Sequence, residues 1–144
     1  MNIRELQEYL VDSLNKVEAL LQGRCKAFAE DTREVYDESS QFIREGGVAV
    51  VVVTPDLQRN GCASAGVPMD TKLLIRCMEL PPVAASNPNT IRALDAAEIV
   101  GHALDCETIQ FESIRQTQSQ DREGNSVITA TATFNATIYL TKGE

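Results

Sequence analysis

The stretch Gly46-Gly47-Val48-Ala49-Val50-Val51-Val52-Val53-Thr54-Pro55 decides the fold. Between a glycine pair and a proline it holds six consecutive apolar residues, and five of them are valine. This length and this β-branched content are typical of a strand that is buried on both faces. We therefore predict a central strand here, with the other elements packed around it.

The length and the charge of the chain limit what it can be. A chain of 144 residues has the size of one domain, and its formal net charge is −8. Nucleic acids and anionic membranes attract clustered Lys and Arg, so this charge argues against both as partners. No window approaches the roughly 20 apolar residues of a membrane span, and the first five residues do not resemble the start of a signal peptide. We expect a soluble protein that is made inside the cell.

No cluster of residues spells out a reaction. The four cysteines, Cys25, Cys62, Cys77 and Cys106, form no C-x-x-C pair, and we expect free thiols. The single histidine, His102, lies four residues before Cys106, but no second pair of metal ligands stands near it. We expect His102 to face solvent on the polar side of a helix. We therefore expect no cofactor and no metal, and the carboxylates spread through so acidic a chain mark no particular acid–base site.

Apolar periodicity predicts two helices before the valine strand, with a short strand between them. In the helix predicted over residues 3–21, apolar residues recur every three or four positions at Ile3, Leu6, Leu10, Leu14, Val17 and Leu21. A weak alternation over residues 24–29 indicates a short edge strand. The second helix is predicted between Asp31, as its cap, and Gly46, with an inner side formed by Val35, Tyr36, Ser39, Phe42 and Ile43.

A loop, a strand and a third helix are predicted after the valine strand. Residues 56–70 hold turn formers and few large apolar side chains, which favours a protruding hairpin loop. Residues 71–80 are expected to form a strand that pairs antiparallel with the valine strand. The third helix is predicted over residues 89–104, capped by Asn87 or Asn89, with an inner stripe of Ile91, Leu94, Ala97, Gly101 and Leu104.

The last part of the chain predicts a β-hairpin with arms at residues 108–119 and 127–142. The second arm alternates between an apolar face and a face with Thr129, Thr131, Thr133, Asn135, Thr137 and Tyr139. The exposed edge of so long a strand is a candidate for pairing with a neighbouring subunit. The fold class that follows is a single α+β domain over residues 1–144, with a mostly antiparallel sheet of about four to five strands packed by an N-terminal helix and two further helices. The expected order is α-β-α-β-β-α-β-β.

This order of elements resembles that of small tail-completion proteins of tailed bacteriophages and prophages, the tail terminators above all. The resemblance is carried by Phe42-Ile43-Arg44-Glu45-Gly46-Gly47 with the valine strand after it, and by the helix that follows Thr90 and runs from Leu94 to Leu104. One feature departs from the family pattern. Family members often follow the acidic residue at the end of the third strand with Asn-Pro, whereas Glu79 precedes Leu80-Pro81-Pro82 and the Asn-Pro step comes at Asn87-Pro88.

The resemblance implies a structural virion protein without catalytic residues. Such a protein forms a ring, expected to be a hexamer, on the end of the tail tube, where it stops tube polymerisation and forms the tail side of the head–tail junction. The implied partners are further copies of itself, the tail tube protein and a neck or head-completion protein, while DNA passes through the lumen without specific binding. The implied location is the virion tail, assembled in the host cytoplasm. Two alternatives stay open, a neck or head-completion adaptor and a small enzyme or ligand-binding α+β domain.

Two sets of residues are candidates for the assembly surfaces. The candidate contacts with the tube or with the next subunit are Leu57, Arg59, Val67, Met69, Ile99, Thr131, Thr133 and Tyr139. The candidate acidic face of the lumen is Glu34, Asp37, Glu38 and Glu45. An acidic lumen without Lys or Arg would let DNA slide, because nothing there would hold the phosphates.

Overall fold

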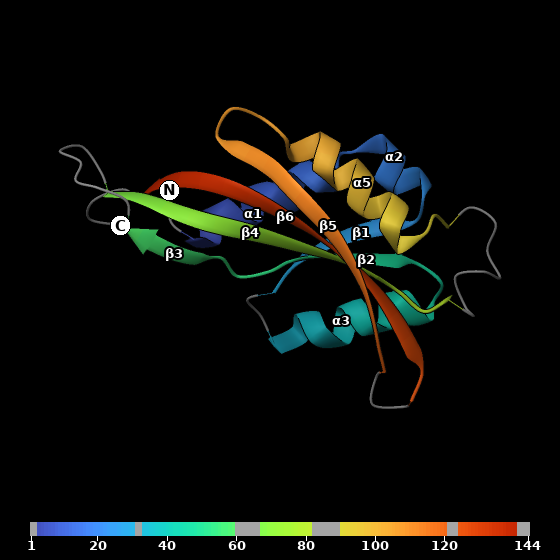
Figure 1. Ribbon diagram of the computed structural model, residues 1–144. Helices are drawn as coiled ribbons and strands as arrows, with labels where there is room; N and C mark the ends of the chain where they lie inside the picture. The colour runs from blue at the N-terminus through green and yellow to red at the C-terminus, as the bar shows by residue number, and fades with distance from the viewer. Residues whose placement is uncertain (1–2, 31–32, 60–66, 82–89, 121–123, 141–144) are drawn as a thin grey trace.

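The elements of the chain form one six-stranded sheet with helices on both of its faces. The computed structural model describes residues 3–30, 33–59, 67–81, 90–120 and 124–140. The elements are α1 (Ile3–Leu14), α2 (Glu18–Gln22), β1 (Cys25–Ala29), α3 (Arg33–Arg44), β2 (Val48–Val52), β3 (Asp56–Arg59), β4 (Val67–Glu79), α5 (Ala93–Leu104), β5 (Ile109–Gln120) and β6 (Ser126–Leu140) (Figure 1). The predicted α+β class is confirmed.

The valine stretch forms an interior strand, although it is not the middle one. The strand order is β1-β2-β4-β6-β5, with β3 beside β4 off this path. β1 and β2 are parallel, and all other pairs are antiparallel. All five residues of β2 are buried, as expected, and its pairing with residues 75–78 is confirmed. The middle of the order belongs to β4, because the long hairpin of β5 and β6 extends the sheet on that side.

Helices cover the two faces of the sheet unequally. The helices α1, α2 and α5 pack on one face and form the main core with residues such as Leu10, Val50, Ile75, Val100 and Phe134 (Figure 1). α3 packs on the other face over β1 and β2, where a smaller core holds Phe28, Ile43, Ala49, Leu80 and Val127. The main core therefore extends across the sheet, while the smaller core occupies one part of the opposite face.

The first predicted helix is wrong as a single element, because the structure breaks it into α1 and α2. After Leu14 the backbone tightens, and Val17 N donates to the Leu14 carbonyl at 3.1 Å, a bond over three residues in place of four. After the break, residues other than the predicted ones face the core. Leu20 is buried with 2% of its surface exposed, while Leu21, which was predicted in the stripe, is 53% exposed.

The third predicted helix starts later and turns a different side inward. α5 begins at Ala93, and its N-cap, Arg92, makes no side-chain capping bond. The suggested caps Asn87 and Asn89 lie outside the described residues. The buried stripe consists of Ala93, Ala96, Ala97, Val100, Gly101 and Leu104. Leu94 is 40% exposed, because the small residues beside it bring the helix close to the sheet and a leucine there has no room underneath.

Within the predicted hairpin loop of residues 56–70, the described residues 56–59 and 67–70 are paired strands, and the residues between them lie outside the described part of the chain. β3 pairs with β4 from Asp56 opposite Lys72 to Arg59 opposite Met69. This pairing accounts for the sixth strand of the sheet. The C-terminal hairpin is confirmed, with β5 and β6 paired from Ile109 to Gln120. However, β6 lies between β4 and β5, so the free edge that was predicted for β6 belongs to β5.

The glycine pair before β2 serves two separate needs. Gly46 has a φ of +91°, a conformation that side chains disfavour, and it ends the segment of α3. At Gly47, a Cβ would lie 2.4 Å from a ring carbon of Phe42, so any side chain there would force this ring to move. The pair thus turns the chain from α3 into the buried strand.

Candidate assembly surface

A large part of one sheet face has no helix over it among the described residues. On β4 the residues alternate, with Leu73, Ile75 and Cys77 in the main core and Lys72, Leu74 and Arg76 on the opposite side. On β6, Thr131 lies opposite Arg76 and Thr133 lies opposite Leu74. We call the side of the sheet that carries these side chains the open face, namely Lys72, Leu74 and Arg76 of β4, Thr131, Thr133 and Asn135 of β6, and Glu112 of β5.

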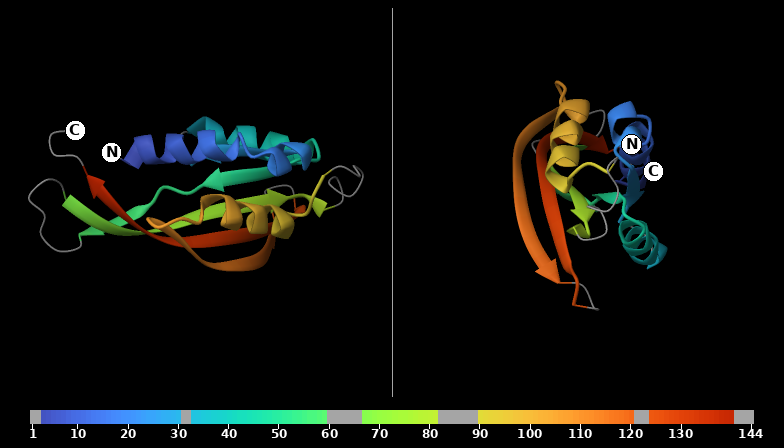
Figure 2. Two further views of the ribbon diagram at one scale, coloured as in Figure 1. Left: turned by 90° about the horizontal axis from the view of Figure 1, so that it is seen from above. Right: turned by 90° about the vertical axis from the view of Figure 1, so that its right-hand side faces the viewer.

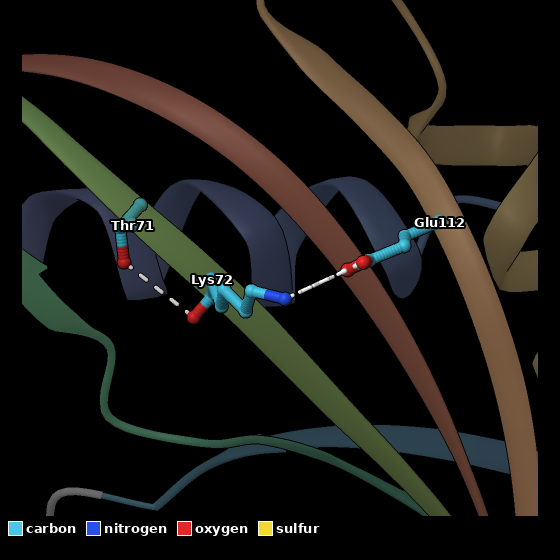
Figure 3. A network of polar contacts seen from close by, with 3 residues as sticks. All are labelled: Thr71, Lys72 and Glu112. Carbon is cyan, nitrogen blue, oxygen red and sulfur yellow. Dashed lines mark hydrogen bonds and ion pairs between the residues drawn. The ribbon is translucent and has the colours of Figure 1, made fainter.

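Ion pairs tie the strands of the open face together. Lys72 Nζ lies 3.2 Å from Glu112 Oε2, so the pair spans from β4 across β6 to β5 (Figure 3). In that view α1 lies behind the sheet, on the packed side. A second pair joins Arg76 to Glu30, at the end of β1, with 3.7 Å between Arg76 Nη1 and Glu30 Oε2. Both pairs are solvent-exposed, so each stabilises the fold by at most about 1 kcal/mol.

A broad groove runs along the end of the open face near β3. Its volume is about 940 Å³, and its lining includes Thr54, Lys72, Leu74, Gln110 and Thr137. The groove collects hydroxyl, amide and aliphatic groups together with three charged side chains, Asp70, Lys72 and Glu107.

The predicted contact residues lie in different parts of the molecule. Thr131 and Thr133 are half-buried on the open face. Ile99 is also half-buried, but it packs against the main core and so does not lie on the polar side of α5 where it was predicted. The backbones of the others fall in β3, β4 and β6, and their side chains lie outside the described residues, namely those of Leu57, Arg59, Val67, Met69 and Tyr139.

The predicted acidic face is part of α3 and the turn after it. Asp37, Glu38 and Glu45 are exposed. The side chain of Glu34 lies outside the described residues. Gln41 Nε2 donates to Glu45 Oε1 at 3.0 Å, so a polar contact holds the end of this acidic surface.

The thiols and the histidine form no metal site in the described part of the chain. No group of three or more His, Cys, Asp or Glu residues in the described ranges can hold an ion. Cys25, Cys77 and Cys106 are free thiols, as predicted, and Cys62 lies outside the described residues. Burial raises the pKa of Cys25 to about 12 and raises the pKa of Cys77 still further. His102 is exposed, as predicted.

Cys106 differs from the buried thiols because it is exposed after α5. The hydrogen bonds that its sulfur makes with the Thr108 hydroxyl and backbone lower its pKa. Among the described residues, no third potential metal ligand lies close to both His102 and Cys106. Their spacing therefore has no counterpart in a metal centre among the described residues.

A buried carboxylate at the start of α5 was not anticipated. Glu79, at the end of β4, has 1% of its side chain exposed, and its Oε1 accepts a bond of 2.9 Å from Arg92 Nε. Its Oε2 has no hydrogen-bond partner among the described residues. The sequence marked Glu79 only as the end of a strand, since the partner lies 13 residues further on and no local pattern links the two. The pair fastens the N-terminus of α5 to the sheet.

No helix of the described chain is both long enough and apolar enough to cross a membrane. Comparison with protein-family models and with curated proteins gives no match. Among solved structures, the chain is similar to a chain from the virion of a native gene transfer agent particle. The TM-score is 0.53 at 13% sequence identity, and the match covers 95% of this chain and 97% of the other. At this identity the likeness establishes a shared fold over nearly the whole of both chains.

Proposed function

We propose that this chain is a structural protein of a phage-like virion that closes the end of the tail tube as a ring. It would end tube polymerisation and form the tail side of the head–tail junction, assembled in the host cytoplasm. The observation that carries the proposal is the likeness to a chain of a gene transfer agent virion over 95% of the present chain. The partners in this proposal are further copies of the chain, with six as the expected number, the tube protein and a neck protein.

The surfaces of the molecule agree with a structural role. The open face and the groove beside it present hydroxyl, amide and paired charged groups. These are groups that contact neighbouring proteins well, because they form hydrogen bonds at the rim of an interface at little cost. Repeating one head-to-tail contact builds a ring when the rotation between neighbouring copies closes after a whole number of copies.

The acidic surface of α3 has a defined place in this proposal. Asp37, Glu38 and Glu45 are exposed together on one helix and its following turn. If α3 lines the lumen, six copies repeat these carboxylates around the channel. Arg44 is exposed at the end of α3 as well, so the described side chains of this surface leave two negative charges per copy, three carboxylates against one guanidinium. DNA then passes without being held, because the net negative charge repels phosphates over about one Debye length.

The proposal is tested with tubes assembled from the tube protein of the same virion. Purified chain is added to growing tubes, and their ends and lengths are measured by negative-stain electron microscopy. We expect a ring at one end of each tube and an early stop of elongation. Tubes that grow to the same lengths with bare ends would contradict the proposal, and binding to the neck protein alone would favour the head-completion role.

A charge-reversal variant tests whether α3 lines the lumen. Asp37→Lys with Glu38→Lys reverses the charge of two exposed positions without touching the core. Rings of this variant are expected to form and cap tubes normally but to retain DNA at low salt, as a filter-binding assay would detect. The matched control is Glu98→Lys on α5, which is exposed and lies on the other side of the sheet. Equal DNA retention by both variants would remove α3 from the lumen.

A further inference from the structure

The described sheet has three strands with an unpaired edge, and they are not equivalent. β1 and β5 end the strand order, and β3 lies beside β4 with no strand on its other side. Unpaired N–H and C=O groups on such edges are templates for pairing with another strand, and proteins usually protect them. The protection of each edge therefore indicates where another strand is meant to pair.

The β1 edge is closed by a single side chain. Arg24 and Glu30, on either side of this strand, make their backbone hydrogen bonds with β2, so Ala27 directs its N–H and C=O away from the sheet. Asn15 fills this position, because its Oδ1 accepts from Ala27 N at 2.9 Å and its Nδ2 donates to the Ala27 carbonyl at 3.4 Å. The amide thus occupies the middle of the five-residue edge in the way a neighbouring strand would.

In the described part of the chain, the β5 edge is closed at its beginning only. Phe111 N donates to Asp105 Oδ1 at 3.0 Å, and the Ile109 carbonyl accepts from Cys106 N at 2.7 Å, so these groups point away from β6. At the register shift between Phe111 and Ser113, the set of residues whose backbone groups point away from β6 changes from odd-numbered to even-numbered. Beyond the shift, the backbone N–H and C=O groups that point outward belong to even-numbered residues, Gln116 and Gln118 among them.

The remaining stretch of β5 lacks the usual protection of an edge. Residues 113–120 read Ser-Ile-Arg-Gln-Thr-Gln-Ser-Gln, with one charge, no lysine and no proline. Among the described residues, no strand lies beyond it (Figure 2, right). In a chain with a net charge of −8, this near-neutral edge is a place where two copies can approach without strong repulsion.

The β3 edge is the second open one, and it lies at the opposite corner of the sheet. Val53 N donates to the Leu74 carbonyl. The backbone N–H and C=O groups of the even-numbered residues of β4 therefore point along the sheet toward β2 and β3. Asp56 and Gln58 lie opposite Lys72 and Asp70 and bond to them, which leaves the N–H groups of Leu57 and Arg59 pointing outward. β3 lies level with residues 135–138 of β6, whereas the open stretch of β5 lies level with residues 126–133.

We propose that the outer edge of β3 in one copy of the chain pairs with residues 113–120 of β5 in the next copy. Two different open edges at opposite corners give a head-to-tail contact, and only such a contact builds a ring from identical subunits. Pairing through β5 alone would stop at a two-fold dimer. The proposal deepens the ring-forming function proposed above and rests on it for the biological use of the contact.

The test replaces one outward N–H on each edge. Gln118→Pro removes a donor of β5, and Leu57→Pro removes a donor of β3, while proline is tolerated on an edge strand where the N–H faces solvent. Gln118→Ala and Leu57→Ala keep the donors and serve as matched controls. Circular dichroism and thermal unfolding check that each variant keeps the fold. A deletion of residues 56–70 is less suitable, since it also removes the first residues of β4.

Self-association is measured by sedimentation velocity up to about 1 mM, the dissociation constant of a very weak contact. We expect the wild type and the alanine controls to form oligomers larger than dimers. Each proline variant alone is expected to stay monomeric, with its dissociation constant raised at least about tenfold. Mixed together, the two proline variants are expected to form a one-to-one dimer, because each keeps the edge that the other has lost.

Several outcomes would overturn the head-to-tail contact. These are a wild type that stays monomeric throughout, a Leu57→Pro variant that still dimerises alone, and proline variants that do not pair when mixed. The tube-capping assay decides the proposed function separately. Proline variants that still cap tubes would leave that function standing and remove this contact, whereas edge pairing without capping would do the reverse.

Discussion

The two faces of the same strands are built for different purposes. On β4 and β6 the packed face holds Ile75, Cys77, Ala132 and Phe134, all with no exposed surface, under α1 and α5. On the other face of these strands stand lysine, arginine and threonine, with no described helix over them. The packed face therefore supplies most of the stability, while the proposed assembly depends on the open face and the sheet edges. Substitutions on each face separate these two roles.

The largest effect is expected from the centre of the packed face. Phe134 is fully buried and meets the ring of Phe111 edge-on, with 5.7 Å between the ring centroids. Phe134→Ala removes this contact and leaves a cavity, which should lower the free energy of unfolding by about 3–5 kcal/mol. Urea denaturation measures the loss. The neighbouring Thr133→Ala, on the open face, should lower it by less than about 1 kcal/mol, and equal losses would refute the contrast between the faces.

The thiols of the packed face should make stability fall in alkaline solution. An unfolded thiol titrates near pH 9, whereas the pKa of buried Cys25 is about 12 and that of Cys77 is raised further. Above pH 9 the unfolded state has lost these protons and the folded state has kept them, so deprotonation favours unfolding. Stability is fully present below pH 9 and should be lower by about 1.4 kcal/mol per thiol at pH 10.

Denaturation curves at pH 7 and pH 10 measure this loss. Cys25→Ala should remove about half of the difference that the two thiols cause, and Cys106→Ala should not reduce it, since Cys106 is exposed. A pH dependence that is identical in the wild type and in Cys25→Ala would show that the buried thiols do not cause it.

The sequence predicted those elements whose signal is local. The valine run, the alternation of the last strand and the α3 periodicity gave elements that the structure confirms, because each pattern repeats within a few residues. The break after Leu14 was missed, and the contact of Asn15 with Ala27 beside it joins segments that no local pattern links. β3 was missed for the same reason, because residues 56–59 are a strand only through their pairing with β4.

The assembly surface was less accessible to prediction than the fold. The threonines of β6 were placed on one face correctly, but which edge is open depends on the order of the strands. The contact of Arg92 with Glu79 likewise joins two segments that no pattern links. These features depend on contacts between segments far apart in the chain, and the local pattern of one sequence does not show such contacts.

α3 is connected to β2 through Gly46 and Gly47, and it packs on the same side of the sheet as the open face. A Cβ at Gly47 would lie 2.4 Å from the Phe42 ring, so Gly47→Ala should lower the free energy of unfolding by about 1–3 kcal/mol. Because the clash is with the Phe42 ring, a smaller side chain at position 42 should give the methyl group room and restore part of the lost stability. Gly47→Ala with Phe42→Leu should therefore lose less than the sum of the two single changes. Strict additivity in urea denaturation would refute the clash.

The smallest effect is expected on the open face itself. Lys72 and Glu112 form an ion pair at 3.2 Å, but their side chains are 64% and 39% exposed, so water and salt screen their attraction. Lys72→Ala should lower the free energy of unfolding by about 0.2–1 kcal/mol, and a double-mutant cycle with Glu112→Ala should give a coupling in that range which fades as salt is added. A coupling above about 2 kcal/mol that salt does not weaken would mean that this pair is shielded from water. The open face would then be covered in solution, and the distinction between a face that stabilises the fold and a face that is free for assembly would fail at this position.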